Sequence, residues 1–412
     1  MTTALLIVAM AAGFYMAWNI GANDVANAMG TVVGSGAVTL RKAIVLAGIF
    51  EFAGAFLVGS SVADTIKGDI VPVEAFASVE LFSLGMLGAL LASSLWLNVA
   101  TAMGQPVSTT HAIIGAVIGF AVLTEGFDCV KWSNMTAIVA SWVISPLVGG
   151  ALAFCAYRGI RRWVLQSRHP VFMARRAVPA ACATVIFILT MSVTYQGLPR
   201  LRLNMPLGSA ILTSLGVAII VGGATWLNGL RNRKHVPLRH RYEVVEHWFS
   251  RLQLVTGCYM AFAHGANDVA NAIGPLSGAI QGLREGAISA KSQIPPWLLA
   301  FGGVGIVVGL ATYGYKVIES VGKKITEITP TRGFSAELGT ATTVLVCSKL
   351  GLPISTTFVL VGAVMGVGLA RGFGAIDLRV IRKIFASWLI TIPVSAGLSA
   401  LIFQLLRAIT GM

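Results

Sequence analysis

The run Gly-Ala-Asn-Asp-Val-Ala-Asn-Ala occurs twice in the chain, at 21–28 and at 265–272. Each copy lies in a strongly apolar stretch and brings one carboxylate and two carboxamides into it. An ionisable side chain at the centre of a membrane costs roughly 2.5–3.5 kcal/mol on insertion scales, so such residues usually have a function. Two copies of the same costly group indicate a duplicated chain with a polar centre.

The carboxylates and amides of each octapeptide share one face of a helix, because they are three or four residues apart. The candidate cation ligands are Asn23, Asp24, Asn27, Asn267, Asp268 and Asn271. A small hard cation prefers several such oxygens, and Na⁺ fits this set. The alternatives are a helix-capping aspartate with structural amides, and a protonated aspartate that carries a coupled proton. Gly30, Gly274 and Pro275 further predict that both octapeptide helices are interrupted.

A second motif follows each octapeptide: Gly-Gln-Pro-Val-Ser-Thr-Thr at 104–110 is matched by Gly-Leu-Pro-Ile-Ser-Thr-Thr at 351–357. Proline breaks a helix, and Ser or Thr after the break can cap the helix that resumes. The free N–H groups of the new helix attract an anion, and the hydroxyls add donors. The candidate anion ligands are therefore Ser108, Thr109, Thr110, Ser355, Thr356 and Thr357. In a merely kinked helix these hydroxyls would instead donate to backbone carbonyls.

The composition is that of a membrane protein, since 56% of the residues are hydrophobic and only 11% are charged. A soluble domain carries about 25% charged residues. Several apolar runs reach the length of roughly 20 residues that spans a bilayer. They are Ala43–Val62, Asn134–Tyr157, Ala177–Tyr195, Pro206–Leu227 and Ile384–Leu406. We expect an all-α polytopic membrane protein, with the five scattered cysteines as packing residues in helices.

The net charge of +14 comes largely from two basic clusters, at 158–176 and 231–251. Clusters beside membrane spans indicate cytoplasmic loops rather than nucleic-acid binding. With both in the cytoplasm, both termini lie on the non-cytoplasmic side of the cell membrane, and the multi-pass chain has about twelve membrane segments. An odd number of segments precedes the second octapeptide, so the repeats enter from opposite faces. This is an inverted-topology duplication with broken or re-entrant helices, an architecture common in secondary transporters.

Further matched segments, 115–119 with 362–366 and 141–145 with 387–391, show that the repeat extends well beyond the two motifs. The predicted organisation has three parts. Residues 1–158 form the first inverted repeat and 252–412 the second. Residues 159–251 supply connecting helices with basic cytoplasmic loops, which join the two halves.

Single polar residues in apolar segments allow more than one interpretation. Glu51 is either a coupling acid or a partner of a neighbouring helix. His111 fits a structural role better than a shared proton relay, because Phe358 takes its place in the second copy. Gln105 could donate to an anion, and Lys349 can extend its ammonium to the interface. No catalytic triad, P-loop or metal-hydrolase helix is present, so we expect neither an enzyme nor an ATP-driven pump.

The two octapeptides, each followed by Gly-x-Pro-[Val/Ile]-Ser-Thr-Thr, resemble the inorganic phosphate transporter (PiT) family over both repeats. The resemblance implies a symporter that imports phosphate with sodium by alternating access. A proton-coupled phosphate or sulfate symporter is the alternative. It assigns phosphate to the six hydroxyl residues and sodium to the six octapeptide residues. It implies sodium as the coupling ion without another cofactor, a lipid bilayer, and a homodimer in many members. The family often has His at the position of Phe358.

Two other classes of protein remain as rivals. An ion channel would need a continuous polar pore, and it would pass its ion without coupling to a gradient. An intramembrane enzyme would need a nucleophile with a base in reach, and His111 beside 108–110 is the one hint of such a pair.

Overall fold

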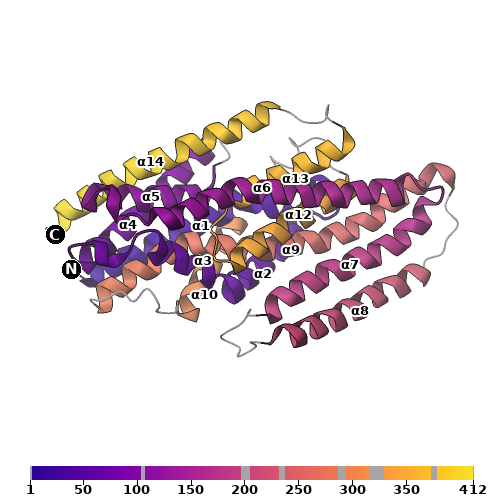
Figure 1. The fold of residues 1–412 in the computed structure, drawn as a ribbon, viewed down its shortest axis with the longest axis horizontal. Helices are drawn as coiled ribbons and strands as arrows, with labels where there is room; N and C mark the ends of the chain where they lie inside the picture. Colours follow the sequence, from indigo (N-terminus) through magenta and orange to yellow (C-terminus); the bar gives the residue numbers. More distant parts are fainter. Residues whose placement is uncertain are drawn as a thin grey trace.

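The computed structural model describes residues 2–103, 107–195, 205–231, 237–285, 294–315, 329–372 and 378–411, which are almost entirely helical. Many of the long helices run roughly along the longest axis of the molecule (Figure 1). The helices are α1 (Thr2–Gly34), α2 (Leu40–Val58), α3 (Ser60–Asp64), α4 (Val79–Ala102), α5 (Thr109–Glu125), α6 (Trp132–Ile160), α7 (Pro170–Thr194), α8 (Leu207–Arg231), α9 (Arg241–Glu285), α10 (Pro296–Gly309), α12 (Pro330–Lys349), α13 (Thr356–Arg371) and α14 (Leu378–Thr410). Short 3-10 and π segments are η1 (Thr65–Asp69), η2 (Val73–Ala75), η3 (Phe127–Cys129), η4 (Arg161–Leu165), η6 (Leu238–His240) and η7 (Leu310–Gly314).

Seven helices of the described chain are long and apolar enough to cross a membrane, and a bent pair makes an eighth span. In that pair, α2 meets the segment Ser60–Ala75 at an angle of 59°. α5 and α13 are shorter apolar helices, and α9 and α12 are more polar than the spanning helices. The predicted polytopic helical architecture is therefore confirmed.

Most predicted spans coincide with helices, since α6, α7, α8 and α14 cover four of the five apolar runs almost completely. The span predicted at 43–62 is wrong at its end, because the helix bends at Gly59. The chain then continues as α3 and η1. The basic clusters also differ from the prediction. Much of each lies on helices, in η4 and α7 and in the first turns of α9, because these helices extend beyond their apolar parts.

The two helices that carry the octapeptides are continuous, so the interruption predicted at Gly30, Gly274 and Pro275 is wrong. α1 runs unbroken to Gly34, and α9 passes through Pro275 to Glu285. A proline removes one N–H donor from a helix, but α9 keeps its other bonds and packs against α1, α2, α4 and α12. The octapeptide side chains are thus presented from regular helix, and the helix breaks lie elsewhere.

Elements with matching sequence motifs pack reciprocally across the two halves of the chain. α1 contacts α10 while α2 contacts α9, and α5 contacts α14 while α6 contacts α13. The glycines that open the octapeptides make this reciprocity precise to the residue. Gly21 lies against the backbone carbonyl of Ile306, and Gly265 lies against that of Glu51. Ile306 is therefore the counterpart of Glu51. The division of the chain near 158 and 251 stays a prediction.

Both of these glycines should be intolerant of even one added methyl group. A Cβ at Gly21 or Gly265 would overlap a carbonyl oxygen of a neighbouring helix, and such overpacking typically costs about 1–3 kcal/mol. Gly21→Ala and Gly265→Ala should each lower the melting temperature and the yield of monodisperse protein. Gly216→Ala on α8 is the matched control, because nothing lies within 4 Å of its added Cβ. Equal stability of all three variants would contradict this close helix packing.

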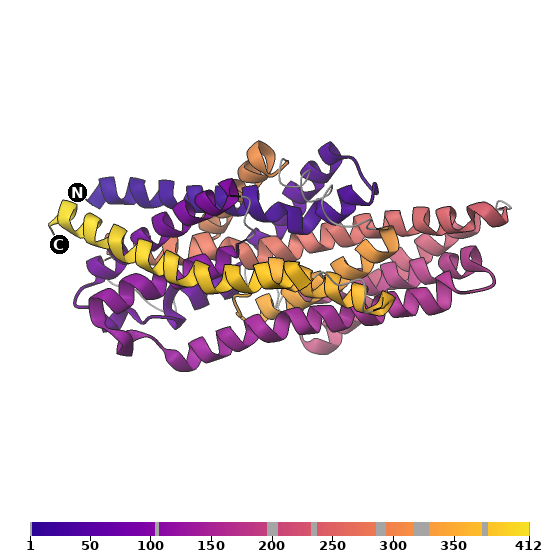
Figure 2. The same ribbon diagram turned by 90° about the horizontal axis from the view of Figure 1, so that it is seen from above.

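The start of α1 and the end of α14 lie at the same end of the molecule in both views (Figures 1 and 2). α7 and α8 pack against each other, and α7 also packs against α9. Termini at one end agree with an even number of membrane segments. That this end faces outward stays a prediction from the charge distribution.

Candidate functional site

Both Ser-Thr-Thr motifs lie where one helix has ended and the next begins. α4 ends at Ala102 and α5 begins at Thr109, and the Ser108 hydroxyl accepts a hydrogen bond from the His111 backbone N–H at 3.2 Å. In the second half, α12 ends at Lys349 and α13 begins at Thr356. The predicted helix breaks and the Ser108 cap are therefore confirmed. Gly104, Gln105 and Pro106 lie outside the described residues.

The octapeptide of each half contacts the Ser-Thr-Thr motif of the other half. Asn27 Nδ2 donates to Thr357 Oγ1 at 2.8 Å. Asn271 Nδ2 donates to the hydroxyls of Thr109 and Thr110, both at 3.2 Å. These bonds are reciprocal, because each joins a second octapeptide asparagine to the start of the opposite helix. Segments more than 150 positions apart in sequence thus meet in one buried cluster.

The threonine hydroxyls also reach the two aspartates. Thr356 Oγ1 donates to Asp268 Oδ2 at 2.9 Å, and Thr357 Oγ1 donates to Asp24 Oδ1 at 3.4 Å. Thr110 instead donates to the backbone carbonyl of Ile354 at 2.9 Å. The residues that the sequence divides into anion ligands and cation ligands are therefore directly bonded to one another. A change in what the carboxylates bind therefore changes the hydrogen bonding of the threonine hydroxyls.

The first asparagine of each octapeptide bonds to the broken helix of its own half. Thr101 Oγ1 on α4 donates to Asn23 Oδ1 at 3.3 Å. Asn267 is best satisfied with its amide turned so that Oδ1 accepts from Ser348 on α12, while Nδ2 donates to Asp268 Oδ1 at 2.9 Å. Thr101 and Ser348 each precede the Gly-x-Pro glycine by three positions. Both asparagines therefore tie an octapeptide helix to the helix that breaks beside it.

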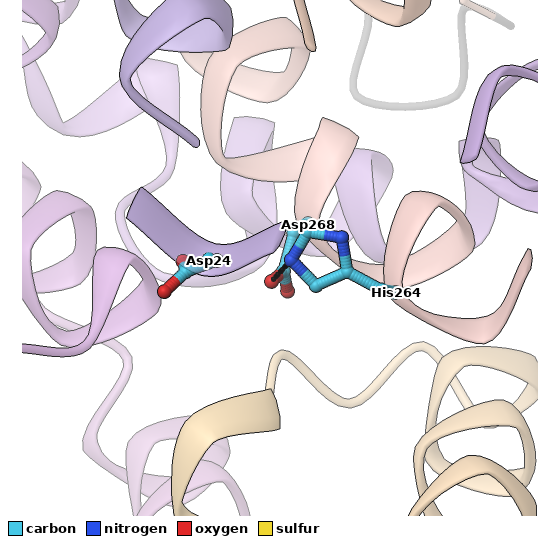
Figure 3. A group of neighbouring side chains, drawn as sticks. All are labelled: Asp24, His264 and Asp268. Atoms are coloured by element: carbon cyan, nitrogen blue, oxygen red, sulfur yellow. Dashed lines mark ion pairs between the residues drawn. The ribbon is translucent and has the colours of Figure 1, made fainter. Parts of the chain in front are cut away.

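A histidine that the sequence analysis did not single out touches the second aspartate. His264 Nε2 lies 2.9 Å from Asp268 Oδ2, and His264 Nδ1 lies 3.1 Å from Glu51 Oε1. All three side chains are buried. Asp24, on α1, completes the group, because one ligand atom from each of Asp24, His264 and Asp268 lies within 4.8 Å of the others (Figure 3). Glu51 thus bonds to a neighbouring helix, one of the two roles that the sequence left open.

The sequence held one signal for this histidine, which was its place directly before the second octapeptide. The first octapeptide is preceded by Ile20 instead. A search for the shared motif alone therefore misses a residue that only one copy has.

The model of the phosphate transporter family matches residues 20–399. The chain belongs to the phosphate transporter family. Two relatives, each named "putative phosphate permease", come from Pyrococcus furiosus (42% identity, 99% of this chain and 97% of the relative) and Haemophilus influenzae (44%, 96% and 95%). A third is the chloroplastic inorganic phosphate transporter 2-1 of Arabidopsis thaliana (44% identity, 94% of this chain and 70% of the relative).

A solved structure described as "The sodium-dependent phosphate transporter" has the same fold. It superposes with a TM-score of 0.92 at 40% identity, and the match covers 98% of this chain and 100% of that one. The protein is therefore a membrane transporter of phosphate and not an enzyme, as the sequence analysis predicted.

The phosphate transporter has a further buried acid that the sequence analysis did not weigh. Glu337 on α12 accepts hydrogen bonds from Gln253 Nε2 at 2.9 Å, from Thr256 Oγ1 at 2.6 Å and from the hydroxyl of Thr31. These donors come from α9 and α1. The signal in the sequence was a single glutamate in an otherwise nearly neutral helix. In the structure, neutral donors within the described chain satisfy both of its oxygens.

His111 of the transporter lies between two aromatic rings. Its centroid is 3.9 Å from that of Trp142 in an edge-on arrangement, and 5.2 Å from that of Phe358. Phe358 is its counterpart in the second half, so the two positions meet each other. This packing favours the structural interpretation of His111 over a relay shared by both halves.

Proposed function

We propose that the protein is a sodium-coupled symporter that imports inorganic phosphate by alternating access. The observation that carries the proposal is the pair of hydrogen bonds from Ser-Thr-Thr hydroxyls to octapeptide carboxylates, Thr356 to Asp268 and Thr357 to Asp24. Structural likeness to a sodium-dependent phosphate transporter supports it. The proposal assigns sodium to the two octapeptides and phosphate to the two helix starts.

Charge balance explains why such a site needs cations. Asp24 and Asp268 are buried close together, and within the described chain neither forms an ion pair with a lysine or an arginine. A phosphate entering beside two carboxylates would be repelled strongly, because the interior screens charges far less than water does. Two sodium ions would neutralise the two carboxylates and remove this repulsion. The anion should therefore bind well only when cations are present.

The hydroxyls provide the link between cation and anion. A hydroxyl has one proton to donate, and in this structure Thr356 and Thr357 give theirs to carboxylates. A sodium ion bound to the carboxylate would occupy the same oxygen lone pairs. The hydroxyls could then turn and donate to a phosphate oxygen, where a bond to a charged acceptor is stronger than a neutral one. In this scheme sodium binding prepares the phosphate site.

The starts of α5 and α13 supply the other features of an anion site. Free N–H groups and the positive end of the helix dipole favour a negative ligand there. The buried Ser355 hydroxyl has no hydrogen-bond partner among the described residues, so it has capacity for a ligand. Thr110 would have to leave the Ile354 carbonyl to contribute. The reciprocal packing of the two halves suits alternating access, since exchanging their conformations would move the opening from one face to the other.

A proton-coupled transporter is the second candidate. It is favoured by the buried contacts from Glu51 through His264 to Asp268, since all three side chains can carry protons. Sulfate is an alternative substrate, because it is also a tetrahedral anion. Excess sulfate should not compete with labelled phosphate uptake if the proposal is correct.

Uptake of labelled phosphate into proteoliposomes tests the coupling ion. Sodium and proton gradients are imposed separately at fixed external pH. Because two cations are required, uptake should rise cooperatively with sodium and give a Hill coefficient above one. Uptake at the full rate in sodium-free buffer with a proton gradient alone would contradict sodium coupling and favour the second candidate.

A further inference from the structure

We infer that Glu51 and His264 act as positioning residues for Asp268, and that they make its cation site tighter than the Asp24 site. This inference rests on the proposed sodium coupling and adds an order of sodium binding, in which the Asp268 site fills first. Neither positioning residue touches the cation. Their role is to hold the carboxylate that does.

The imidazole of His264 is fixed at both nitrogens. Nδ1 faces Glu51 on α2 at 3.1 Å, and Nε2 faces Asp268 one turn along α9 at 2.9 Å. The pair Glu51–His264 can be a carboxylate with an imidazolium or a carboxylic acid with a neutral imidazole. Both arrangements leave the pair without net charge and place a hydrogen on Nε2. Asp268 therefore faces an N–H group at 2.9 Å and keeps its own negative charge for a cation.

This donor fixes the orientation of the Asp268 carboxylate. Oδ2 is contacted by His264 Nε2 and by the Thr356 hydroxyl, from two different helices. With Oδ2 held in this way and Oδ1 accepting from Asn267, the carboxylate cannot rotate freely about its last bond, so Oδ1 keeps one direction. A ligand that is already oriented loses less entropy when it binds its ion, which is why supporting hydrogen bonds raise the affinity of metal sites.

The first half of the transporter has no such support. Ile20 precedes the first octapeptide where His264 precedes the second. Ile306 lies against Gly21 as Glu51 lies against Gly265. Both polar partners are thus replaced by isoleucine at the positions that the packing of the two halves makes equivalent. The hydrogen bonds that Asp24 accepts from Asn27 and Thr357 are both long, at 3.4 Å.

The repeat itself provides the substitution that tests the inference. Glu51→Ile with His264→Ile gives the second half the same apolar pair as the first, and leaves neither a lone buried carboxylate nor a lone buried imidazole. Sodium binding is measured as the rise in melting temperature of the purified transporter, since a ligand that binds the folded state stabilises it. Choline chloride keeps the ionic strength constant, and phosphate is left out.

The two aspartates are separated by working in single-site backgrounds. In Asp24→Asn only the Asp268 site remains, and the double substitution should raise the half-saturating sodium concentration about tenfold or more, as expected for a lost hydrogen bond to a charged group. In Asp268→Asn the same double substitution should change it by less than about twofold, since Glu51 and His264 do not position Asp24. The Asp24→Asn protein should also bind sodium more tightly than Asp268→Asn.

Ile20→Val with Ile306→Val is the matched control, because it alters the equivalent helix contact without a polar group and should leave the sodium affinity unchanged. Equal shifts in both backgrounds, or no shift in either, would overturn the positioning role. The single changes Glu51→Ile and His264→Ile should also fail to add, because Glu51 acts through His264. A wild-type protein without any response to sodium would overturn the proposed coupling ion as well.

Discussion

Asp24→Asn and Asp268→Asn should each reduce sodium-driven phosphate uptake by at least about 100-fold. Both aspartates are buried, and each is the one acidic residue of its octapeptide. The substitution keeps the shape of the side chain and removes the charge that holds the cation in an environment of low dielectric constant. One sodium then no longer binds, and the phosphate loses one of the two neighbouring cations. Initial rates in proteoliposomes with an imposed sodium gradient measure the effect.

Asp128→Asn is the matched control for this experiment, since Asp128 is an exposed acid on η3 and should keep the wild-type rate. The rates are compared at equal amounts of folded protein. Each variant should still show a sodium-dependent rise in melting temperature through its remaining site. Unchanged kinetics and sodium dependence in both aspartate variants would exclude the octapeptides as cation sites.

The main features of the site could be predicted because they are local in sequence and occur twice. Two identical octapeptides specify which carboxylates and amides share a helix face, and proline before Ser-Thr-Thr specifies where a helix must break. The helix breaks before Thr109 and Thr356 follow from the restriction that proline places on the backbone. Duplication adds that the two copies meet, as the bonds from Asn27 and Asn271 to the opposite motifs show.

The parts that escaped prediction depend on tertiary contacts or on differences between the copies. His264 belongs to no shared motif, and its partner Glu51 lies on another helix more than 200 positions away in sequence. Pro275 was expected to interrupt its helix, yet α9 continues through it and packs against neighbouring helices on several sides. The bend at Gly59 has no proline to mark it. Sequence patterns indicate which groups are costly to bury, but the partners that satisfy them appear only in the fold.

Thr109→Val and Thr356→Val should each raise the phosphate concentration for half-maximal uptake by about tenfold or more, because each removes a hydrogen bond to a charged ligand. Valine keeps the β-branched shape and removes the hydroxyl. In this structure Thr356 donates to Asp268 and Thr109 accepts from Asn271. Both hydroxyls therefore form hydrogen bonds with a residue of another helix. The maximal rate at saturating phosphate should fall less than the affinity.

Thr136→Val separates this role from a structural one. The Thr136 hydroxyl donates to the carbonyl of Trp132 one turn back on α6, which is the bond that a purely helical role would require. Its loss should leave phosphate affinity unchanged. If both variants instead behave like Thr136→Val, the hydroxyls serve the helices and phosphate binds elsewhere.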